Sequence, residues 1–556
     1  MREPAILSCV LLAAVAATCR ADTDADRYLI AVRQYADNVL RYGRDTYGPK
    51  KTPLFVDGIN VDTHEPPEWK NKGETWIVSN FASQQNMFRV LDGLTGLTGD
   101  RKYRGAAVRA VGYALKNLCA QNGLLYWGGH YAYDAAGDKP IKKQEDHELK
   151  QHYPYYELMW RVDPAVTKRF VEAFWRAHVY DWNNLDMNRH GRYDRDTSGP
   201  WPENYVGGPV FFTSERGCRS FVNTGSDLIY AGTMLHEFTG ERMPLVWAQR
   251  LAYRYVETRN PKTGLGGYEY SRLKEDRAET QFSGVPRLKG HPALEGTIVD
   301  SKSRMRFGAL SIVQLKLSEM LGEEGSDFRK WAIEDLRAYA KHAYNPADNT
   351  FSAMLTDGTK LTGADIQKNG YYGKVGTSGK FAPIKGDGTF LWAYAMAYRI
   401  SGDAYMWQMA RNIARALGLG DIGDGPKSAA KLDMNTDCSD PKDLLSCLEL
   451  CRSTGGRAFL DLAVSIGDNI LERRFHKGFF VRSDQHLYAR FDDMEPLALL
   501  ALAAMLRGEP GAVPDAWPTD SFFDCTYDGH GSKTDTSFIY SRTRSTVEPA
   551  PGKQAE

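Results

Sequence analysis

The chain has 556 residues, of which 42% are hydrophobic and 25% are charged, as in ordinary globular proteins. This composition excludes a mainly disordered, collagenous or multispanning chain. Lys and Arg together number 70, as do Asp and Glu, so the formal net charge is zero. A neutral chain is not expected to bind nucleic acid through general basicity, but it can still contain a local basic pocket for an anionic substrate.

The N-terminus has the pattern of a signal peptide. Arg2 supplies a positive charge, an apolar run follows over Ala5–Ala17, and Cys19-Arg20-Ala21 places small residues at the positions that signal peptidase inspects. The run is too short to cross a bilayer, and no other segment has the apolar length of a membrane helix. We therefore expect residues 1–21 to direct export to the periplasm or the medium, without stable membrane insertion. A lipoprotein anchored in the outer membrane is the less favoured alternative.

Apolar side chains recur with the 3.6-residue period of an α-helix through most of the chain. Within Asp24–Arg44, one stripe contains Leu29, Val32, Ala36 and Val39. The same period predicts further helices over residues 101–115, 164–180, 243–256, 331–343, 405–417 and 459–471. We therefore expect an all-α fold with long loops between the helices.

Three short segments share a pattern that predicts tight helical hairpins. They are Leu97-Thr98-Gly99-Asp100, Phe238-Thr239-Gly240-Glu241 and Ile400-Ser401-Gly402-Asp403, and each lies between two helical stretches. Glycine ends a helix readily because it adopts the left-handed conformation, and the acidic residue then begins the next helix as a cap or a first-turn charge. Repeated hairpins must stack to bury their shared faces. A closed ring of hairpins, an (α/α) barrel or toroid, fits this pattern, and a tandem set of helical domains is the alternative.

The loops between the hairpins are rich in Gly, Asp, Pro and aromatic residues. Leu124–Tyr133 predicts short extended structure that Gly128 and Gly129 interrupt. The polar, Pro-containing segment 542–556 is typical of a disordered tail. We expect a single (α/α)-barrel domain over residues 22–541, with short β segments in its loops, followed by that tail.

The signatures of phosphate-binding loops, HExxH zinc sites, GxSxG hydrolases and EF-hands are absent from the sequence. Candidate chemistry instead gathers between Gly128 and Arg195, a region that holds five of the twelve histidines. Imidazole and carboxylate together suit a divalent transition metal, and a metal with few protein ligands keeps positions open for a substrate carboxylate. The candidates are His130, His147, Glu148, His152, Glu157, His178, Arg189 and His190.

Each histidine also has a structural interpretation. His130 follows two glycines, and such a loop can expose it to a cleft. His152 and His178 lie among aromatic residues and are expected to be packed. His147 and Glu148 are adjacent, so their side chains can point in different directions, and the pattern favours an exposed, salt-bridged Glu148 over a ligand.

Two further candidates depend on local structure. The run Ala177–Asn188 (AHVYDWNNLDMN) is interpreted as helical, so Arg189-His190-Gly191 is expected to begin a loop. Glu157 lies among aromatic residues, where a buried, hydrogen-bonded carboxylate is as compatible with the pattern as a catalytic one. These patterns predict a metal site without fixing its members.

The ordered set of these segments resembles the pectate lyases of polysaccharide lyase family 2. The resemblance extends over roughly residues 25 to 505 and implies an (α/α)7 barrel. It also implies a catalytic domain that cleaves α-1,4-linked polygalacturonate or oligogalacturonides by β-elimination, giving 4,5-unsaturated products. The matching stretches are Gly128-Gly129-His130, His147-Glu148-Leu149-Lys150, Pro154–Met159, Ala177–Trp182, Asn188–Gly191, Asp387–Trp392 and Ala416–Asp421.

The resemblance implies a role for four residues. His130, Glu148 and His190 would hold a divalent transition metal, commonly Mn2+ in this family, with Co2+, Ni2+ or Ca2+ as alternatives. Arg189, next to the second histidine, would be the Brønsted base. The implied partner is an acidic polysaccharide, and we expect the protein to be a monomer.

The reaction explains why these residue types are needed. β-Elimination removes the proton at C5 of a uronate, and this proton is weakly acidic while the neighbouring carboxylate is charged. A divalent metal on that carboxylate neutralises it and stabilises the developing charge. Arginine is an unusual base, because its side chain has a pKa above about 12 in water, which a metal and burial would have to lower. Tyr131, Tyr133 and a metal-bound hydroxide are alternative bases, and Arg189 could instead clamp a uronate.

Two other functions are compatible with the sequence. A glycoside hydrolase on a similar helical toroid, acting on a uronic-acid-containing polysaccharide, would need two carboxylates across a sugar, such as Glu157 with Asp387 or Asp181. A non-catalytic glycan-binding protein would use Tyr and Trp side chains as a sugar platform. Only a lyase forms an unsaturated, ultraviolet-absorbing product.

Overall fold

The computed structural model describes residues 25–71, 73–214, 216, 220–273, 304–363, 381–526 and 532–545. The predicted signal peptide, residues 1–21, and most of the predicted tail, residues 546–556, lie outside the described residues. Residues 542–545 at the start of that tail are described, and Thr543 forms a β-bridge with His486. Among the described residues, no helix is both long and apolar enough to cross a membrane.

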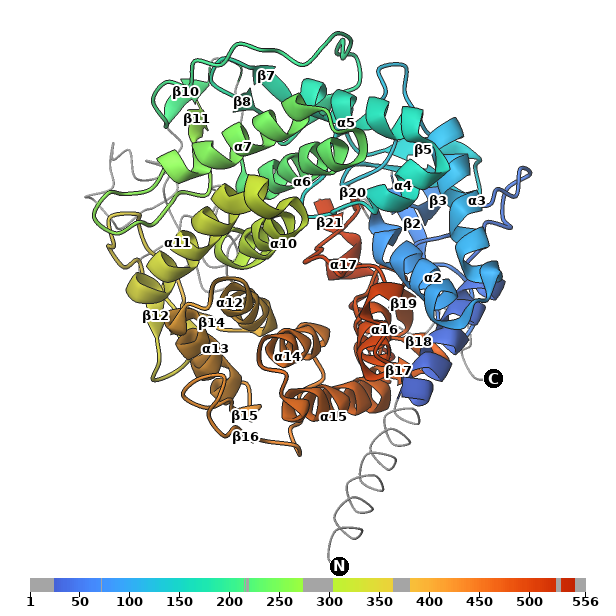
Figure 1. Cartoon of the computed structure of the whole chain (residues 1–556). Coiled ribbons are helices and arrows are strands. Elements are labelled where there is room, and N and C mark those ends of the chain that lie inside the picture. Colours follow the sequence, from blue (N-terminus) through green and yellow to red (C-terminus); the bar gives the residue numbers. More distant parts are fainter. Residues whose placement is uncertain are drawn as a thin grey trace, which may run out of the picture.

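The described helices form a closed ring of two concentric layers (Figure 1). Seven of them form the inner layer: α2 (Gln85–Thr98), α4 (Tyr156–Val162), α6 (Val222–Thr239), α10 (Ser311–Leu321), α12 (Gly388–Ser401), α14 (Pro441–Thr454) and α16 (Glu495–Leu506). Seven form the outer layer: residues 25–42, α3 (Arg101–Asn117), α5 (Pro164–His178), α7 (Arg242–Glu257), α11 (Ser326–Ala343), α13 (Ala404–Ala416) and α15 (Arg457–Arg474). The predicted (α/α) barrel is confirmed.

The two ends of the chain close this ring. The last inner helix, α16, packs against the first, α2. The N-terminal helix, residues 25–42, completes the outer layer between α15 and α3 (Figure 1). Its Tyr28 hydroxyl donates to the Val464 carbonyl at 2.9 Å, and its Asp37 accepts a hydrogen bond from Tyr103 at 3.0 Å. A ring closed in this way packs the inner helices against one another and against the outer layer.

Glycine ends the first helix of all three predicted hairpins, and aspartate caps the second helix in two of them, whereas Glu241 makes no capping hydrogen bond. Gly99, Gly240 and Gly402 end α2, α6 and α12 with φ of 72°, 69° and 68°, in the left-handed conformation. Asp100 and Asp403 then cap α3 and α13 by accepting backbone N–H groups of the first turn. The hairpin pattern in the sequence is therefore confirmed at the level of backbone geometry.

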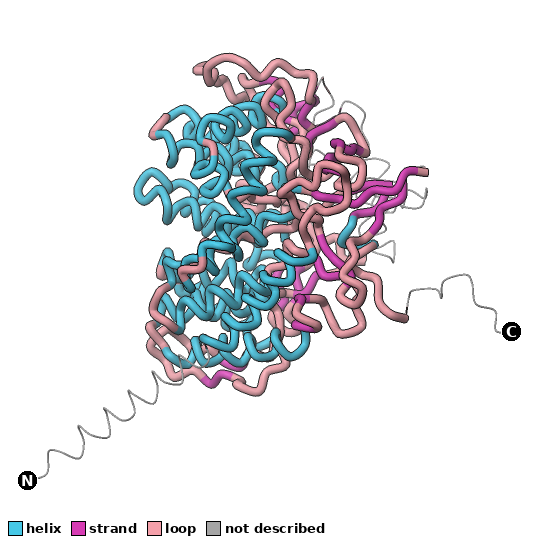
Figure 2. The backbone as a smooth tube through the Cα atoms, turned by 90° about the vertical axis from the view of Figure 1, so that its right-hand side faces the viewer, coloured by secondary structure: helices cyan, strands magenta, loops and turns pink. Residues whose placement is uncertain are grey.

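Short strands and long loops cover one side of the helical ring (Figure 2). Its largest sheet is antiparallel and contains β2 (Glu68–Asn71), β3 (Glu74–Ser79), β4 (Tyr131–Asp134) and β5 (Lys139–Lys142). Antiparallel pairs join β1 (Gly58–Asn60) to β19 (Tyr488–Arg490), β6 (Asp146–His147) to β9 (Gly191–Arg192), β7 (Val179–Asp181) to β8 (Asp186–Met187), and β20 (Asp524–Thr526) to β21 (Ser532–Thr534). This layer brings the two ends of the chain together, because β1 and β19 come from opposite ends.

The remaining strands are also short. They are β10 (Phe212–Ser214) with β11 (Ser271–Leu273), β12 (Tyr344–Asn345) with β13 (Thr350–Phe351) and β14 (Ile384–Lys385), β15 (Gly420–Asp421) with β16 (Lys431–Leu432), and β17 (Phe475–His476) with β18 (Phe479–Phe480). A short helix, α17 (Asp535–Phe538), follows β21.

The helical interpretation of Ala177–Asn188 is wrong. Helix α5 ends at His178, and the chain continues as the hairpin of β7 and β8. Val179 takes extended backbone angles, and its side chain is buried, as is that of Met187 opposite it. A run that mixes apolar and polar residues over so short a length does not separate a helix from a tight hairpin.

Asp57 beside β1 is expected to make stability depend on pH. Its Oδ1 accepts hydrogen bonds from the Asn80 amide at 2.6 Å and the Gln84 side chain at 2.7 Å, whereas its buried Oδ2 has no hydrogen-bond partner. Burial raises the pKa of Asp57 from 3.8 to about 8. Between these values the folded chain holds a proton that the unfolded chain releases, so the free energy of unfolding falls as pH rises, by up to about 1.4 kcal/mol per pH unit.

The variant Asp57→Asn keeps the shape of the side chain and cannot ionise. We expect its Tm to fall less than that of the wild type between about pH 5 and about pH 8.5, measured by calorimetry. Asp26→Asn is the matched control, because the Asp26 carboxylate is exposed and pairs with Arg507 at 2.6 Å. Parallel wild-type and Asp57→Asn curves would contradict the buried proton.

Candidate metal centre

Two adjacent glycines place His130 against the strand that carries Glu148. Gly128 has φ of +104°, and a Cβ there would lie 2.2 Å from the Glu148 carbonyl oxygen. A Cβ at Gly129 would lie 2.7 Å from Glu148 Oε2. The backbone amide of Gly129 donates a hydrogen bond to the Glu148 carbonyl oxygen at 2.8 Å. Only glycine permits this close approach of the two backbone segments. His130 is the next residue and directly precedes β4.

Asn80 fixes the peptide of Gly128 from both sides. Its side-chain amide donates to the Gly128 carbonyl at 2.8 Å, and its Oδ1 accepts from the Gly128 amide at 3.1 Å. Asn80 is fully buried, and its own backbone amide donates to Asp57. No pattern in the sequence indicates this role, because an asparagine before a helix is ordinarily an N-cap, which Asn80 also is for residues 81–84.

The pairing of β6 with β9 brings Glu148 and His190 together. Asp146 lies opposite Arg192, and His147 lies opposite Gly191, so the residues just outside this pairing, Glu148 and His190, fall beside each other. The neighbours His147 and Glu148 point in different directions, as predicted. His147 contacts His178, whereas Glu148 contacts the other candidate ligands.

The structure brings His130, Glu148 and His190 into one cluster. His130 Nε2 lies 3.0 Å from Glu148 Oε2, His190 Nε2 lies 3.3 Å from Glu148 Oε1, and the two Nε2 atoms are 3.3 Å apart. Ligand bonds of about 2.1 Å place neighbouring ligand atoms about 3.0 to 3.4 Å apart around one ion. The spacing of this cluster therefore fits a single divalent transition metal.

The unsatisfied polar atoms of the cluster support the same conclusion. The Glu148 side chain is only 1% exposed, so the interpretation of Glu148 as an exposed residue is wrong. Neither of its oxygens has a hydrogen-bond partner of good geometry, and His130 Nδ1 also has none. Buried polar atoms are normally satisfied. Lys150 Nζ lies 3.0 Å from Glu148 Oε1 and partly neutralises the carboxylate, and a metal ion between the two imidazoles would also satisfy Oε2. Two neutral imidazoles and one carboxylate form a donor set for Mn, Fe, Co, Ni or Zn.

Glu148 and His190 are in the protonation states that metal binding needs. Burial alone would raise the pKa of Glu148, but the Lys150 ammonium and the contacts of His130 and His190 outweigh it, so this pKa is held well below its usual value. Burial lowers the pKa of His190 despite the attraction of Glu148. At neutral pH, Glu148 is therefore ionised and His190 is neutral, and metal can bind without displacing a proton from either.

Two cations border the cluster. Arg189 Nη1 lies 3.6 Å from Glu148 Oε1, with 26% of the side chain exposed, and its guanidinium lies over the Phe221 ring at 5.8 Å. Lys150 Nζ lies 3.0 Å from the same oxygen and over the Phe522 ring at 4.8 Å. Arg189 is a predicted site residue, whereas Lys150 appears in the sequence analysis only within a matching stretch.

The C-terminal segment supplies neighbours that sequence analysis missed. The Asp524 amide donates to the Gly129 carbonyl at 2.7 Å, and its carboxylate is hydrogen-bonded to Lys143. Phe522 packs over Gly129. Asp524 lies 381 residues after Lys143 in the sequence. No local pattern in the sequence relates residues so far apart to one site.

The remaining candidates have structural surroundings. His152 and His178 are fully buried, as predicted. Asp387 caps α12 by accepting the Thr389 amide at 3.1 Å. Glu157 lies in the first turn of α4, where burial raises its pKa. These two carboxylates belong to different helices of the ring and lie outside the metal cluster.

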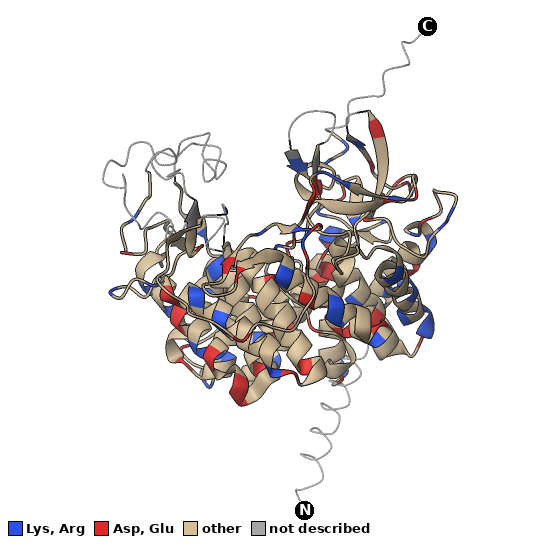
Figure 3. Cartoon of the chain, turned by 90° about the horizontal axis from the view of Figure 1, so that it is seen from above, with Lys and Arg blue, Asp and Glu red and all other residues tan. Residues whose placement is uncertain are grey.

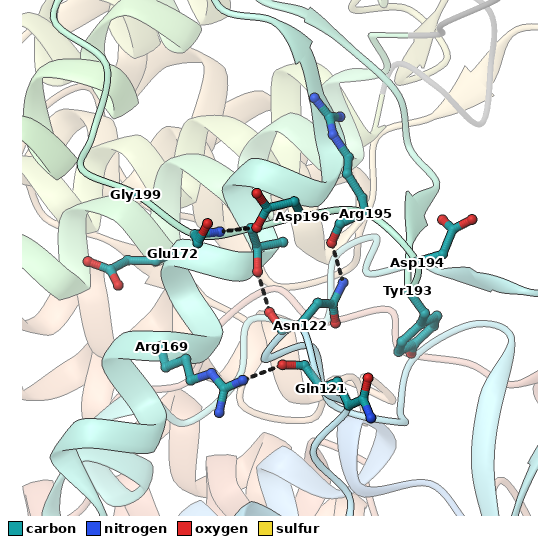
Figure 4. A pocket seen from close by; sticks show the side chains of 11 residues that line it. Gln121, Asn122, Arg169, Glu172, Tyr193, Asp194, Arg195, Asp196 and Gly199 are labelled. Atoms are coloured by element: carbon teal, nitrogen blue, oxygen red, sulfur yellow. Dashed lines mark hydrogen bonds between the residues drawn. The ribbon is translucent and has the colours of Figure 1, made fainter.

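A separate hollow of about 500 Å3 lies beside the strand that follows His190 (Figure 4). Asn122 donates to the Arg195 carbonyl at 3.2 Å across it, and Arg169 donates to the Gln121 carbonyl. None of the three clustered residues lines this hollow. Its hydrogen bonds join Arg195 and Thr197 to Asn122, and Arg169 of α5 to Gln121.

The acid limit of metal binding is expected to depend on Lys150. Because the Lys150 ammonium lowers the pKa of Glu148, Lys150→Met should raise that pKa and extend proton competition to higher pH. We expect the ratio of the metal Kd at about pH 5.5 to that at about pH 7.5 to be several-fold larger in the variant, measured by titration calorimetry. Lys143→Met is the matched control, since that ammonium pairs with Asp524. An unchanged ratio would contradict the role of Lys150.

A ring of helical hairpins, with a buried cluster of two histidines and one glutamate on its loop-covered side, defines an (α/α)-barrel protein with a candidate metal site. The family model described as "Periplasmic pectate lyase" matches residues 52–526. Pectate disaccharide-lyase from Dickeya dadantii (strain 3937) is 31% identical over 555 residues, covering 93% of this chain and 96% of the relative. The chain therefore belongs to the periplasmic pectate lyase family and is a polysaccharide lyase. The predicted family and lyase class are confirmed.

Solved structures with similarity to this chain include two enzymes of sugar metabolism. A D-mannose isomerase is 11% identical with a TM-score of 0.43, covering 76% of this chain and 97% of that chain. Cellobiose 2-epimerase from Bacillus thermoamylovorans B4167 is 11% identical with a TM-score of 0.41, covering 87% of this chain and 100% of that chain.

Proposed function

We propose that the protein cleaves α-1,4-linked polygalacturonate by β-elimination at this cluster. In this proposal His130, Glu148 and His190 hold one divalent transition metal, and Arg189 is the base. The observation that carries it is the meeting of two imidazoles with a buried carboxylate, whose ligand atoms all lie within 4.8 Å of one another. Family membership and the pectate disaccharide-lyase relative support the choice of substrate.

The residues around the cluster suit the chemistry of a uronate. When bound, a divalent ion neutralises the substrate carboxylate and so acidifies the neighbouring C5–H bond. Arg189 lies beside the ligand Glu148 and is partly exposed, so it can reach a sugar that enters the site. It would take the C5 proton, while the C4–O bond breaks, a C4=C5 double bond forms, and the departing glycosidic oxygen gains a proton.

A concentrated positive charge in the site makes a basic surface unnecessary. Lys and Arg residues are interspersed with Asp and Glu around the helical ring (Figure 3). Arg189 and Lys150, by contrast, converge on one buried carboxylate. An acidic polysaccharide would therefore be attracted to the site rather than to the protein surface as a whole.

A product assay tests the proposal. We expect polygalacturonate to yield a product that absorbs in the ultraviolet, and we expect chelation to abolish this activity and Mn2+ to restore it. A hydrolase would release reducing ends without the absorbance, and a glycan-binding protein would release neither. Reducing ends without an unsaturated product, at any added divalent metal, would overturn the proposed reaction.

We further propose Mn2+ as the resident metal, because histidine and carboxylate ligands with open positions suit it. We also propose that residues 1–21 are removed as a signal peptide, that residues 22–541 act as one catalytic domain, and that the exported protein is a monomer in the periplasm. Intact-mass measurement and light scattering of the protein recovered from a periplasmic extract test these points. A mature chain that retains residue 1, or a stable dimer, would contradict them.

A further inference from the structure

A buried chain of hydrogen bonds runs behind the metal cluster. Trp127 Nε1 donates to His147 Nε2 at 3.0 Å. His147 Nδ1 lies 3.0 Å from His178 Nε2, and His178 Nδ1 lies 2.8 Å from the Asn188 carbonyl oxygen. Trp127, His147 and His178 are all fully buried. Every ring nitrogen in this chain of hydrogen bonds therefore has a protein partner.

The chemistry of the two ends fixes the position of every proton. The indole N–H of Trp127 can only donate, so His147 Nε2 must be an unprotonated acceptor. His147 then carries its proton on Nδ1 and donates it to His178 Nε2. His178 likewise carries its proton on Nδ1, which suits the Asn188 carbonyl because a carbonyl can only accept. One arrangement satisfies all the atoms, and in it both imidazoles are neutral.

This chain of hydrogen bonds joins the three segments that carry His130, Glu148 and His190. Trp127 lies three residues before His130, His147 directly precedes Glu148, and Asn188 directly precedes Arg189 and His190. His178, the last residue of α5, connects them to the helical ring.

Further contacts tie the same segments to His178. The Asn188 amide donates to the His178 carbonyl at 2.9 Å, and the Asn188 side chain accepts from the His190 amide at 3.1 Å. The His178 ring also packs against Gly191, where an added Cβ would lie 2.5 Å from it. The His178 ring thus has one closely defined position, with the His190 segment held against it on two sides.

We propose that His147 and His178 are positioning residues of the metal centre, which as neutral Nδ1–H tautomers hold the segments of His130, Glu148 and His190 at metal-binding spacing. This inference rests on the proposed function, since it assigns the cluster to a metal. Neither imidazole contacts the cluster through a ring nitrogen, because both nitrogens of each ring are already bonded within the chain. Their effect on the metal is therefore indirect.

The tautomers can be measured in the unmodified protein. With ring-15N-labelled histidine, we expect long-range 1H–15N spectra to show His147 and His178 each with a protonated Nδ1 and an unprotonated Nε2. Loss of one signal set in His147→Asn and of the other in His178→Asn assigns them. A Nε2–H tautomer or a charged ring at either position would overturn the inference.

Metal affinity tests the positioning role. In His178→Asn, the shorter amide can still donate toward Asn188 but cannot accept from His147. We expect the Kd for Mn2+, measured by calorimetry on metal-free protein, to rise about tenfold, as when other supporting shells of metal sites are lost. At saturating Mn2+ we expect kcat to fall with little change in KM, because the substrate contacts are kept.

Two further variants keep the test decisive. Trp127→Phe retains a ring in the core and removes only the donor that orders the chain, so it should fold and still weaken Mn2+ binding. His236→Asn is the matched control. This partly buried ring donates from Nδ1 to the Glu241 carbonyl at 2.9 Å, and its Nε2 lies 3.4 Å from Glu324. It lies about 20 Å along α6 from the end near Arg189. The variant should lower Tm without changing the Mn2+ affinity.

The outcomes separate this inference from the proposed function. If the wild type binds no Mn2+ and forms no unsaturated product, the proposed function fails. If the wild type binds Mn2+ but His178→Asn and Trp127→Phe bind it equally well, the positioning role fails and the proposed function stands. If all variants, including His236→Asn, lose affinity in proportion to their loss of Tm, the chain is merely structural and the inference is overturned.

Discussion

His190→Ala is expected to remove both bound metal and activity while the fold remains. The His190 side chain is 18% exposed and lies at the edge of the cluster, so its truncation opens no cavity within the helical ring. One of the three proposed ligands is lost, and Glu148 and His130 alone are not expected to hold the ion at ordinary concentrations. We expect less than one-tenth of the wild-type metal content and at least about a 1000-fold loss of kcat/KM, because a metal contributes several kcal/mol to such a reaction.

Metal content by elemental analysis and turnover by the ultraviolet assay check this expectation, and circular dichroism verifies the fold. His486→Ala is the matched control, because that ring is outside the cluster and contacts Ser483 at 2.8 Å. Full activity in His190→Ala would remove this residue from the metal site. Restoration of His190→Ala by high Mn2+ would instead support a weakened site.

The helices that the sequence predicted are those of the outer layer. Each of the seven periodic stretches corresponds to residues 25–42 or to α3, α5, α7, α11, α13 or α15. An outer helix has one apolar face toward the ring and one polar face toward solvent, which is the condition for a 3.6-residue period. Inner helices are surrounded by other elements: ten of the twelve residues of α16 are buried. Burial on several sides weakens the period, so among the inner helices the sequence indicated only α2, α6 and α12, through the glycines that end them.

The clustered side chains were found through a resemblance, and the structure explains why pattern alone could not select them. His147 and His178 have the same residue type as His130 and His190 and lie in the same region of the sequence. Their roles differ because His147 faces inward to Trp127 and His178, while Glu148, one residue later, faces the cluster. This alternation follows from the pairing of β6 with β9, a two-residue strand too short to predict.

The surroundings of the cluster depend on contacts between distant parts of the chain. Asn80 holds Gly128 from 48 residues away, and Phe522 covers Gly129 from the other end of the domain. Ring closure by α16 and α2 brings these segments together. A sequence pattern reports residues within one or two turns of each other, so it cannot show such neighbours without a structure.

Arg189→Lys is expected to reduce turnover far more than substrate binding. Lysine keeps the positive charge that attracts a uronate, but its shorter, non-planar head cannot occupy the position that Arg189 Nη1 takes 3.6 Å from Glu148 Oε1. If Arg189 accepts the C5 proton, its replacement removes general-base catalysis, which contributes about 100-fold to 10000-fold. We therefore expect kcat to fall by at least about 100-fold, KM to change less than about threefold, and Mn2+ affinity to stay near that of the wild type.

The two alternative roles of Arg189 separate in this experiment because they depend on different properties of the side chain. An electrostatic clamp needs only charge near the uronate, so lysine would preserve most of kcat and the loss would appear in KM. Arg192→Lys is the matched control from the same loop, since that guanidinium is 58% exposed and pairs with Asp194; it should leave both constants unchanged. Near-normal kcat in Arg189→Lys would mean that another group is the base, and Tyr131 is the first candidate. Burial and Glu145 raise the pKa of Tyr131, so its hydroxyl is protonated at neutral pH. The assignment of Arg189 depends instead on the family resemblance and on its position 3.6 Å from Glu148 Oε1.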